Sequence, residues 1–160
     1  MVKLTKIYTR TGDDGTTGLA DGTRRAKHDL RIACYGTIDE ANAALGLART
    51  ALEEKSELSG VILRLQNDFF DLGADLATPD PDMEGALRIT DDQVARLEKE
   101  IDTLNTTLDA LESFILRGGT PAAAYLHLAR TITRRAEREL CAAIADGDTA
   151  ISHPARQFLN

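Results

Sequence analysis

The sequence predicts an all-α fold, an antiparallel bundle of four to five long helices behind an irregular N-terminal arm. Three observations favour this class. Apolar residues recur at three- and four-residue spacing along most of the chain, helix start and stop signals separate these stretches, and only residues 2–9 resemble a strand. With 160 residues the chain is long enough for one well-formed core, so we expect a single domain over residues 1–160.

The first two helices are predicted in the N-terminal half. Residues 30–55 are rich in alanine and leucine, as expected of a long helix. Within residues 58–77, apolar side chains repeat at helical spacing, namely Ile62, Leu65, Phe69, Leu72 and Leu76. The prolines of residues 78–81 then end this second helix, because proline cannot continue the hydrogen-bond ladder.

Three further segments are predicted as helix. Thr90 and Gln93 have the spacing of a capping box, and apolar residues follow at helical spacing as far as Leu111. Pro121, placed after two glycines and a threonine, opens a helix that we expect to run to about Asp146. Residues 152–160 resemble the first turns of another helix, which we expect to continue beyond this sequence and to cover the bundle.

The charge distribution argues against some functions and favours another. A net charge of −7 argues against nucleic-acid binding and against a membrane surface, since both partners attract a basic face. Residues 1–31 and 127–138 nevertheless each carry a net +3. Two short basic segments in an acidic chain suggest a confined anionic ligand, although solvated charge clusters are the alternative.

Targeting and metal-binding signals are missing from the sequence. No apolar run approaches the roughly 18 residues that span a bilayer, and no signal peptide follows Met1, so we expect a cytoplasmic protein. Cys34 and Cys141 stand far apart without a Cys/His cluster, which indicates neither a disulfide nor a metal site. Asp39 and Glu40 lack a Glu-x-x-His motif, so a di-metal centre of the ferritin type is not expected either.

Residues 8–18 of the arm have the composition of a phosphate-binding loop. They contain three glycines and five hydroxyl side chains. Glycine permits the positive φ angles that turn backbone amides toward an anion, and threonine hydroxyls add donors without adding charge. No Gly-Lys-Ser/Thr follows, so this is not the common P-loop. Taken alone, such a segment is more often an ordinary surface turn.

The helix predicted from Pro121 carries two stripes. On a helical wheel its core stripe consists of Leu126, Ala129, Ile132, Ala136, Leu140 and Ala143. Arg130 and Glu137 border that stripe, with Arg134 and Arg138 farther round. A guanidinium at the border of burial favours a carboxylate or phosphate partner. The alternative is a solvated face with local Arg/Glu pairs, and His127 is assigned no role.

Several segments together carry a resemblance to a known family. They are Tyr8–Gly18, Arg24–Lys27, Tyr35–Asn42, Phe114–Gly119, Ala129–Arg138 and Phe158–Asn160. In this order they resemble the PduO-type ATP:cob(I)alamin adenosyltransferases, also called corrinoid adenosyltransferases. The resemblance covers essentially the whole chain. It implies a helical-bundle homotrimer that binds ATP between neighbouring subunits.

The resemblance also implies the site residues. Those expected to line the ATP phosphates are Thr9, Arg10, Thr11, Gly12, Asp13, Gly15, Thr17 and Gly18, with Lys27 at the terminal phosphate and Mg²⁺ assisting. Those expected to face the nucleotide from the next subunit are Arg130, Arg134, Arg135, Ala136, Glu137, Arg138 and Asn160, the last contacting the nucleoside. Asp39 is expected to pair with Arg130, and no protein metal site is implied.

The implied reaction transfers the 5′-deoxyadenosyl group of ATP to the cobalt of cob(I)alamin and releases tripolyphosphate. The metal of the corrinoid is the nucleophile, so the protein has only to hold ATP and stabilise the leaving group. Asp39, Arg130 and Phe114 are the implied catalytic residues, with Phe114 displacing the lower axial ligand of cobalt. On sequence alone, Phe114 would instead be a core residue at a helix end. Hand-over of the product to an adenosylcobalamin-dependent enzyme is a further implication.

Two points stay open at the level of sequence. Arg117 stands where the family commonly has proline, and its effect on the loop cannot be derived from the sequence. An alternative function is a non-catalytic ATP-binding helical bundle for cofactor delivery or regulation. In a third, purely structural interpretation, the arginine stripe only stabilises a trimer.

Overall fold

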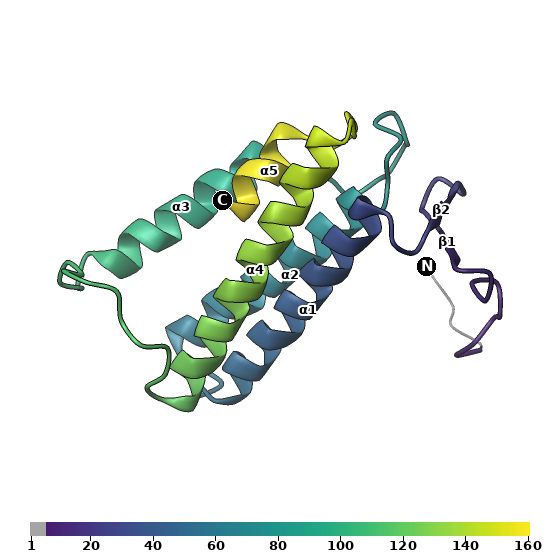
Figure 1. Cartoon of the computed structure of the whole chain (residues 1–160). Coiled ribbons are helices and arrows are strands. Elements are labelled where there is room, and N and C mark those ends of the chain that lie inside the picture. The colour runs from purple at the N-terminus through teal and green to yellow at the C-terminus, as the bar shows by residue number, and fades with distance from the viewer. Residues whose placement is uncertain (1–5) are drawn as a thin grey trace.

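Five helices and a short hairpin make up residues 6–160, the part of the chain that the computed structural model describes (Figure 1). In chain order they are β1 (Thr16–Gly18), β2 (Arg24–Ala26), α1 (Leu30–Thr50), α2 (Glu57–Leu76), α3 (Asp91–Asn105), α4 (Pro121–Ala145) and α5 (His153–Leu159). The predicted helical bundle is therefore confirmed. A short hairpin that the sequence did not reveal precedes it.

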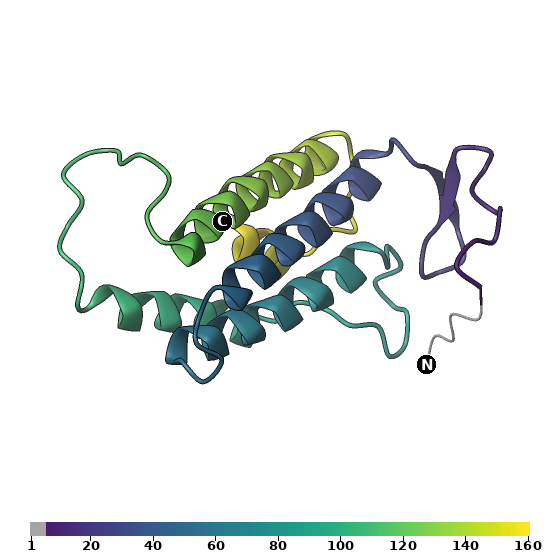
Figure 2. The ribbon, with the colours of Figure 1, turned by 90° about the horizontal axis from the view of Figure 1, so that it is seen from below.

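Helix α1 packs side by side with α4 on one flank and with α2 on the other (Figure 2). Its buried residues recur every three or four positions, among them Cys34, Ile38, Ala41, Leu45 and Ala48. Ala41 and Ala48 are completely buried, and their small side chains allow neighbouring helices to approach closely. The core stripe predicted for α4 is also confirmed, since all its members are buried except the half-buried Leu126.

Side-chain caps fix where the helices begin. In each helix a backbone amide of the first turn donates to the side chain of the residue just before it, namely Asp29, Ser56, Thr90, Thr120 and Ser152. The predicted capping box of α3 is present, with Thr90 and Gln93 satisfying each other's backbone amides. Pro121 occupies the first turn of α4 as predicted.

Helix α3 is shorter than predicted. It ends at Asn105, so the expectation that helix continues to Leu111 is wrong. Leu108 and Leu111 lie in the following loop with exposed fractions of 67% and 75%. Val94 is the one fully buried residue of α3. Since the second half of α3 has no buried face, the apolar spacing beyond it has nothing to pack against, and the chain leaves as a long arch (Figure 2).

Helix α5 closes one end of the bundle by packing against both α3 and α4. Ala155, Phe158 and Leu159 are buried there. The Phe158 ring meets Phe69 of α2 edge-on, with 6.0 Å between ring centroids, a favourable arrangement of two aromatic rings. This short helix thereby joins the core formed by the three longest helices.

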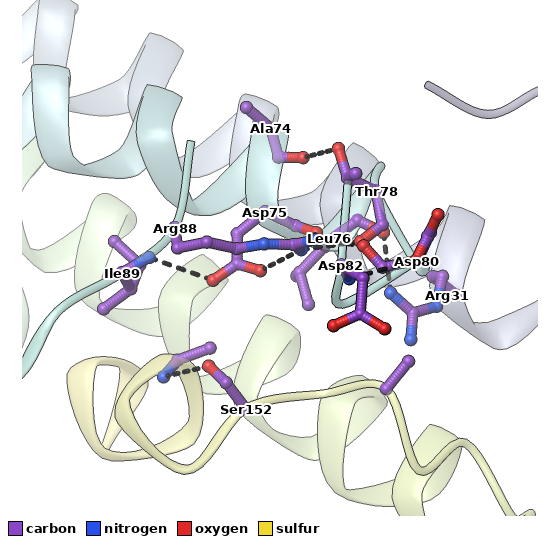
Figure 3. Close-up of polar contacts among 12 residues, drawn as sticks. Arg31, Ala74, Asp75, Leu76, Thr78, Asp80, Asp82, Arg88, Ile89 and Ser152 are labelled. Atoms are coloured by element: carbon purple, nitrogen blue, oxygen red, sulfur yellow. Dashed lines mark hydrogen bonds and ion pairs between the residues drawn. The ribbon is translucent and has the colours of Figure 1, made fainter. Parts of the chain in front are cut away.

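A buried carboxylate fastens the loop after α2 (Figure 3). Asp75 accepts a hydrogen bond of 2.9 Å from the Ile89 backbone amide and pairs with Arg88, whose Nη1 lies 2.9 Å from its Oδ1. Arg88 also donates to the Thr78 carbonyl at 2.6 Å. Asp75 is only 2% exposed, and these partners satisfy it. The loop of residues 77–90 is therefore held against the end of α2.

The N-terminal arm forms a hairpin beyond the end of the bundle at which α1 begins (Figures 1 and 2). β1 pairs antiparallel with β2, and Thr16 lies opposite Ala26. The strand expected over residues 2–9 is not seen: residues 1–5 lie outside the described residues, and residues 6–9 are not strand. Three-residue strands are too short to leave an alternating pattern in the sequence.

Within residues 6–160 there is no helix with both the length and the apolar character needed to cross a membrane.

Candidate functional site

The Gly/Thr-rich loop forms one wall of a pocket in the arm. The pocket measures about 340 Å³ and is lined by Tyr8, Thr9, Arg10, Thr11, Gly12, Asp13, Thr16, Thr17, Gly18, Arg24 and Lys27. Gly15, predicted with these residues, lies outside the lining but shapes the turn with a φ of 81°. The structure therefore gathers nearly all the residues predicted to hold phosphate into one concave surface.

Lys27 lies directly over this loop although it follows 15 residues after Gly12. A Cβ added at Gly12 would come within 3.1 Å of Lys27 Nζ and 3.0 Å of the Thr16 carbonyl oxygen. A side chain at this position would therefore be crowded by the lysine and the neighbouring backbone, which favours glycine. The predicted grouping of Lys27 with the loop is present in the structure.

Arg10 has a backbone conformation that is rare outside glycine. Its φ is 61°, in the left-handed region, which costs a residue with a Cβ about 1–2 kcal/mol. Its guanidinium carbon lies 5.5 Å from the centroid of the Tyr8 ring, in cation–π contact. Strain of this kind persists where surrounding contacts enforce it, and it is common at ligand sites.

Arg24 is a member of this pocket that the site prediction omitted. Its guanidinium donates to the Thr11 carbonyl and to Thr16 Oγ1, and it lies 3.6 Å from Asp14 Oδ1. The basic segment 24–27 was recognised in the sequence, but only Lys27 was assigned a role. The hairpin register, which puts Arg24 opposite Gly18, is what brings its side chain to the loop.

Asp39 lies in a separate groove between α1 and α2. This groove of about 290 Å³ is lined by Tyr35, Ile38, Asp39, Asn42, Phe69, Phe70, Gly73, Ala74 and Ala77. Burial raises the pKa of the Tyr35 phenol, and the neighbouring Thr17 side chain partly opposes the rise. Tyr35 lines this groove, whereas Thr17 lines the phosphate pocket.

The arginines of α4 lie on its exposed side. Arg135 pairs with Glu40 of α1, and Arg134 lies 3.9 Å from Glu137. Arg138 donates to the Arg134 carbonyl at 2.9 Å. The contacts of Arg134 and Arg138 resemble the local pairs of a solvated helix face, whereas Arg135 joins α4 to α1. Such exposed pairs contribute little and can be exchanged for a ligand. Ala136, predicted among the nucleotide-facing positions, is completely buried, so the structure does not bring its side chain to this face.

Arg130 lines a third cavity, a cleft of about 450 Å³ to which all five helices contribute residues. Its lining comprises Leu45, Leu65, Phe69, Leu97, Ile101, Leu126, Ala129, Arg130, Thr133, Arg134, Phe158, Leu159 and Asn160. The wall is mostly apolar, with two guanidinium groups and one amide at its edge. The structure therefore brings Asn160 together with Arg130 and Arg134, as predicted.

Within residues 6–160 the arm and the arginines of α4 line different pockets. Asp39 lines the groove between α1 and α2, whereas Arg130 lines the cleft on the α3 and α5 side of α4. Among residues 6–160 neither takes part in an ion pair. The predicted pairing of Asp39 with Arg130 is therefore not made inside the chain.

Phe114 is fully open to solvent. Its exposed fraction is 97%, and Leu116 beside it is 95% exposed. The interpretation of Phe114 as a core residue at a helix end is therefore wrong, because α3 ends nine residues earlier and leaves this stretch in the arch. Arg117 folds back onto the same stretch, donating to the Ile115 carbonyl at 2.6 Å. An apolar surface displayed on a loop is typical of a binding site.

Comparison with known proteins shows the family of this chain. The family model described as cobalamin adenosyltransferase matches residues 7–160. A corrinoid adenosyltransferase of Mycobacterium leprae is 46% identical over 164 residues, covering 99% of this chain and 86% of that protein. One of Bacillus subtilis is 44% identical over 140 residues, covering 86% of this chain and 71% of that protein.

Solved structures resemble the chain along almost all its length. A phenylalanine-to-alanine variant of the PduO-type ATP:corrinoid adenosyltransferase from Lactobacillus reuteri, complexed with cobalamin and ATP, superposes with a TM-score of 0.86. Its sequence identity is 36%, and the match covers 97% of this chain and 86% of that one. An arginine-to-lysine variant complexed with ATP gives a TM-score of 0.83 at 36% identity, covering 96% and 86%. The chain belongs to the cobalamin adenosyltransferase family.

Proposed function

We propose that this chain transfers the 5′-deoxyadenosyl group of ATP to the cobalt of cob(I)alamin, giving adenosylcobalamin and tripolyphosphate. The observation that carries the proposal is the basic, glycine-shaped pocket of the arm in a chain of this family. The family relatives are named corrinoid adenosyltransferases, and a structural relative binds both cobalamin and ATP. These names support the two substrates proposed here.

The protein's task in this reaction is binding and charge stabilisation. A bond forms between cobalt and the 5′ carbon of ATP, while the bond from that carbon to the phosphate oxygen breaks and leaves its electron pair on tripolyphosphate. Cobalt in cob(I)alamin already has the attacking electron pair, so a general base is not needed. Arg10, Lys27 and the amides of the loop are the groups of this chain that would stabilise the departing charge.

The residues present fit a Mg²⁺ ion that arrives with ATP. No group of three or more His, Cys, Asp or Glu side chains within the described part of the chain is arranged to hold a metal. Asp13 lines the phosphate pocket and is exposed. Mg²⁺ commonly keeps its waters and binds through phosphates with one or two carboxylates, so Asp13 would be its protein contact. When bound, the ion would neutralise phosphate charge.

The proposal includes a homotrimer with a shared site. Within the chain the phosphate pocket and the arginine-edged cleft are separate, and Asp39 and Arg130 lie in different cavities. ATP would be held by the phosphate pocket of one subunit and by the α4 arginines of the next. The Asp39 carboxylate would pair with Arg130 across the same interface. Action in the cytoplasm and hand-over of the product to an adenosylcobalamin-dependent enzyme complete the proposal.

An anaerobic turnover assay tests the reaction. Chemically reduced cob(I)alamin and Mg-ATP are mixed with the protein, and the absorbance of Co(I) is followed. ATP-dependent loss of that absorbance, reversed by light as the cobalt–carbon bond breaks, is expected. ATP binding without any conversion would instead favour the non-catalytic ATP-binding module.

A subunit-mixing experiment tests the shared site. Asp39→Asn and Arg130→Ala proteins are each expected to have little activity. When they are unfolded, mixed and refolded together, some interfaces combine wild-type Asp39 of one subunit with wild-type Arg130 of the next, so activity should return in part. If mixtures stay as inactive as their components while mixed oligomers form, the two residues do not act across an interface.

A further inference from the structure

We propose that Arg24 is a positioning residue, which clamps the segment 10–16 (the phosphate loop) in its anion-binding shape through Thr11 and Thr16. The inference rests on the proposed function and deepens it by adding a residue to the phosphate site. Arg24 belongs to β2, outside the glycine-rich segment itself.

The clamp is visible in the contacts of one guanidinium. Its Nη2 donates to the Thr11 carbonyl at 2.5 Å, and its Nε donates to Thr16 Oγ1 at 3.0 Å. Thr11 and Thr16 lie on opposite sides of the turn that contains Gly12 and Gly15. One planar group therefore connects the two ends of the phosphate loop.

The loop needs such a connection because its backbone is strained. Arg10, directly before Thr11, has a φ of 61°, which a residue with a Cβ seldom adopts. Within the turn, the Gly15 amide donates to the Gly12 carbonyl at 3.2 Å and the Asp13 amide to the Arg10 carbonyl at 3.4 Å. Both hydrogen bonds are long, so the hydrogen bonds within the turn contribute little to its stability. Holding the Thr11 carbonyl opposes relaxation of Arg10 into an ordinary conformation.

Charge gives a second reason for an arginine at this position. Asp14 accepts hydrogen bonds at its Oδ1 from the Thr16 amide at 2.9 Å and from the Thr16 hydroxyl at 2.7 Å. Those hydrogen bonds, and then the positive charge of Arg24, lower the pKa of Asp14, so it is ionised at neutral pH. An ionised carboxylate beside a phosphate site repels the ligand. Arg24 Nη2, 3.6 Å from that carboxylate, offsets its charge.

A lysine in place of Arg24 could not make the same hydrogen bonds to Thr11 and Thr16. Arginine donates from Nε and Nη2 at fixed angles, and within residues 6–160 its Nη1 makes no protein hydrogen bond and remains free for solvent or ligand. A lysine amine would place one donor centre at the end of a flexible stem, and so would keep the charge but lose the link between Thr11 and Thr16.

Arg25 provides a matched control. It is the next residue, it has the same charge, and its side-chain exposure of 36% is close to the 44% of Arg24. Its Nη1 lies 3.2 Å from Oδ2 of Asp29, the residue that caps α1, and it does not contact the phosphate loop. Arg25→Lys therefore makes the same chemical change beside the clamp without touching it.

The experiment measures binding of Mg-tripolyphosphate, the proposed product, by titration calorimetry. The proteins are wild type, Arg24→Lys, Thr16→Val, the double variant and Arg25→Lys. Arg24→Lys and Thr16→Val should each weaken binding about tenfold, since each loses charge-assisted hydrogen bonds. The double variant should lose about tenfold as well, not hundredfold, because both changes break one clamp. Arg25→Lys should bind like wild type.

Three outcomes among the variants would overturn the proposal. Arg24→Lys binding as tightly as wild type would show that charge alone suffices. Additive losses, about hundredfold in the double variant, would assign Arg24 to direct phosphate contact instead. Equal losses in Arg25→Lys would point to a general effect of charge or folding.

Different results would refute the proposed function and this inference. Wild-type protein that binds Mg-tripolyphosphate but never adenosylates cob(I)alamin would refute the function, while the comparison of variants would still decide the role of Arg24. Wild-type protein that does not bind Mg-tripolyphosphate would overturn the inference itself.

Discussion

Arg31 and Asp148 form a buried ion pair between residues 117 positions apart in the chain. Arg31 Nε donates to Asp148 Oδ2 at 2.6 Å, and Arg31 Nη1 donates to the Leu76 carbonyl at 2.8 Å. The arginine is 1% exposed and the Asp148 side chain 12%. One guanidinium therefore connects the first turn of α1, the end of α2 and the segment after α4, at the end of the bundle that carries the N-terminal arm (Figure 1).

Asp148→Ala should destabilise the fold by about 3 kcal/mol, because it leaves the buried charge of Arg31 without its partner. Urea unfolding followed by circular dichroism measures the change. The matched control is Glu100→Ala, which removes a pair with Arg64 on the surface at 2.7 Å and should cost less than about 1 kcal/mol. Equal losses in the two variants would contradict a special role for the buried pair.

The same pair predicts a dependence of stability on pH. Burial alone would raise the pKa of Asp148, but the hydrogen bonds and charge of Arg31 outweigh it and hold the pKa below its ordinary 3.8. Because the folded-state pKa is the lower one, this stabilisation is present above the unfolded pKa and disappears as pH falls through the folded pKa. Unfolding free energies measured from neutral pH down to about pH 3 should therefore fall less steeply for Asp148→Asn than for wild type.

Arg130→Ala should lower kcat/KM for adenosyl transfer at least about hundredfold and weaken ATP binding, because the change removes the proposed charged donor to the nucleotide. The anaerobic Co(I) assay and ATP titration measure the two effects. Arg64→Ala removes an exposed arginine of α2 that lies outside every proposed site and serves as the control. Near-normal turnover in the Arg130→Ala protein would refute the assigned role.

Phe114→Ala should act on reduction more than on transfer. If the phenyl ring displaces the lower axial ligand of cobalt, its loss makes cob(II)alamin harder to reduce, whereas cob(I)alamin prepared in advance reacts as before. Turnover starting from cob(II)alamin and a reductant should fall about tenfold or more, with a much smaller change from cob(I)alamin. Stability should be unchanged, since the ring is 97% exposed. Equal losses from both starting states would exclude this role.

The two thiols should differ in reactivity. Burial raises the pKa of the Cys34 thiol to about 12, so at pH 8 almost none of it is the reactive thiolate. Cys141 is exposed on α4. A chromogenic disulfide reagent should therefore label one thiol per native chain quickly, and Cys141→Ser should abolish that fast phase. Rapid labelling of two thiols in folded protein would contradict the burial of Cys34.

Much of the candidate site could be predicted because its parts are short motifs. The residues of the phosphate loop lie next to one another in the sequence, so a local turn suffices to gather them, whereas Lys27 was assigned by resemblance and reaches them after the hairpin. Arg24 was missed because its role depends on the register of a hairpin whose strands have only three residues. Asp39 and Arg130 were assigned by resemblance, and their pairing stays a prediction because the chain places them in different cavities.

The sequence by itself determined the bundle. Helix caps such as Thr90 and Thr120 act on the first turn that follows them, so they can be recognised in the sequence. The apolar stripe of α4 is visible there as a helical period. Only the tertiary structure decided where α3 ends, that Phe114 is exposed, and that Arg31 meets Asp148. Those outcomes depend on which surfaces are buried by contacts with distant parts of the chain. A single stretch of sequence does not encode that, because the free energy of burial comes from contacts between residues far apart in the chain.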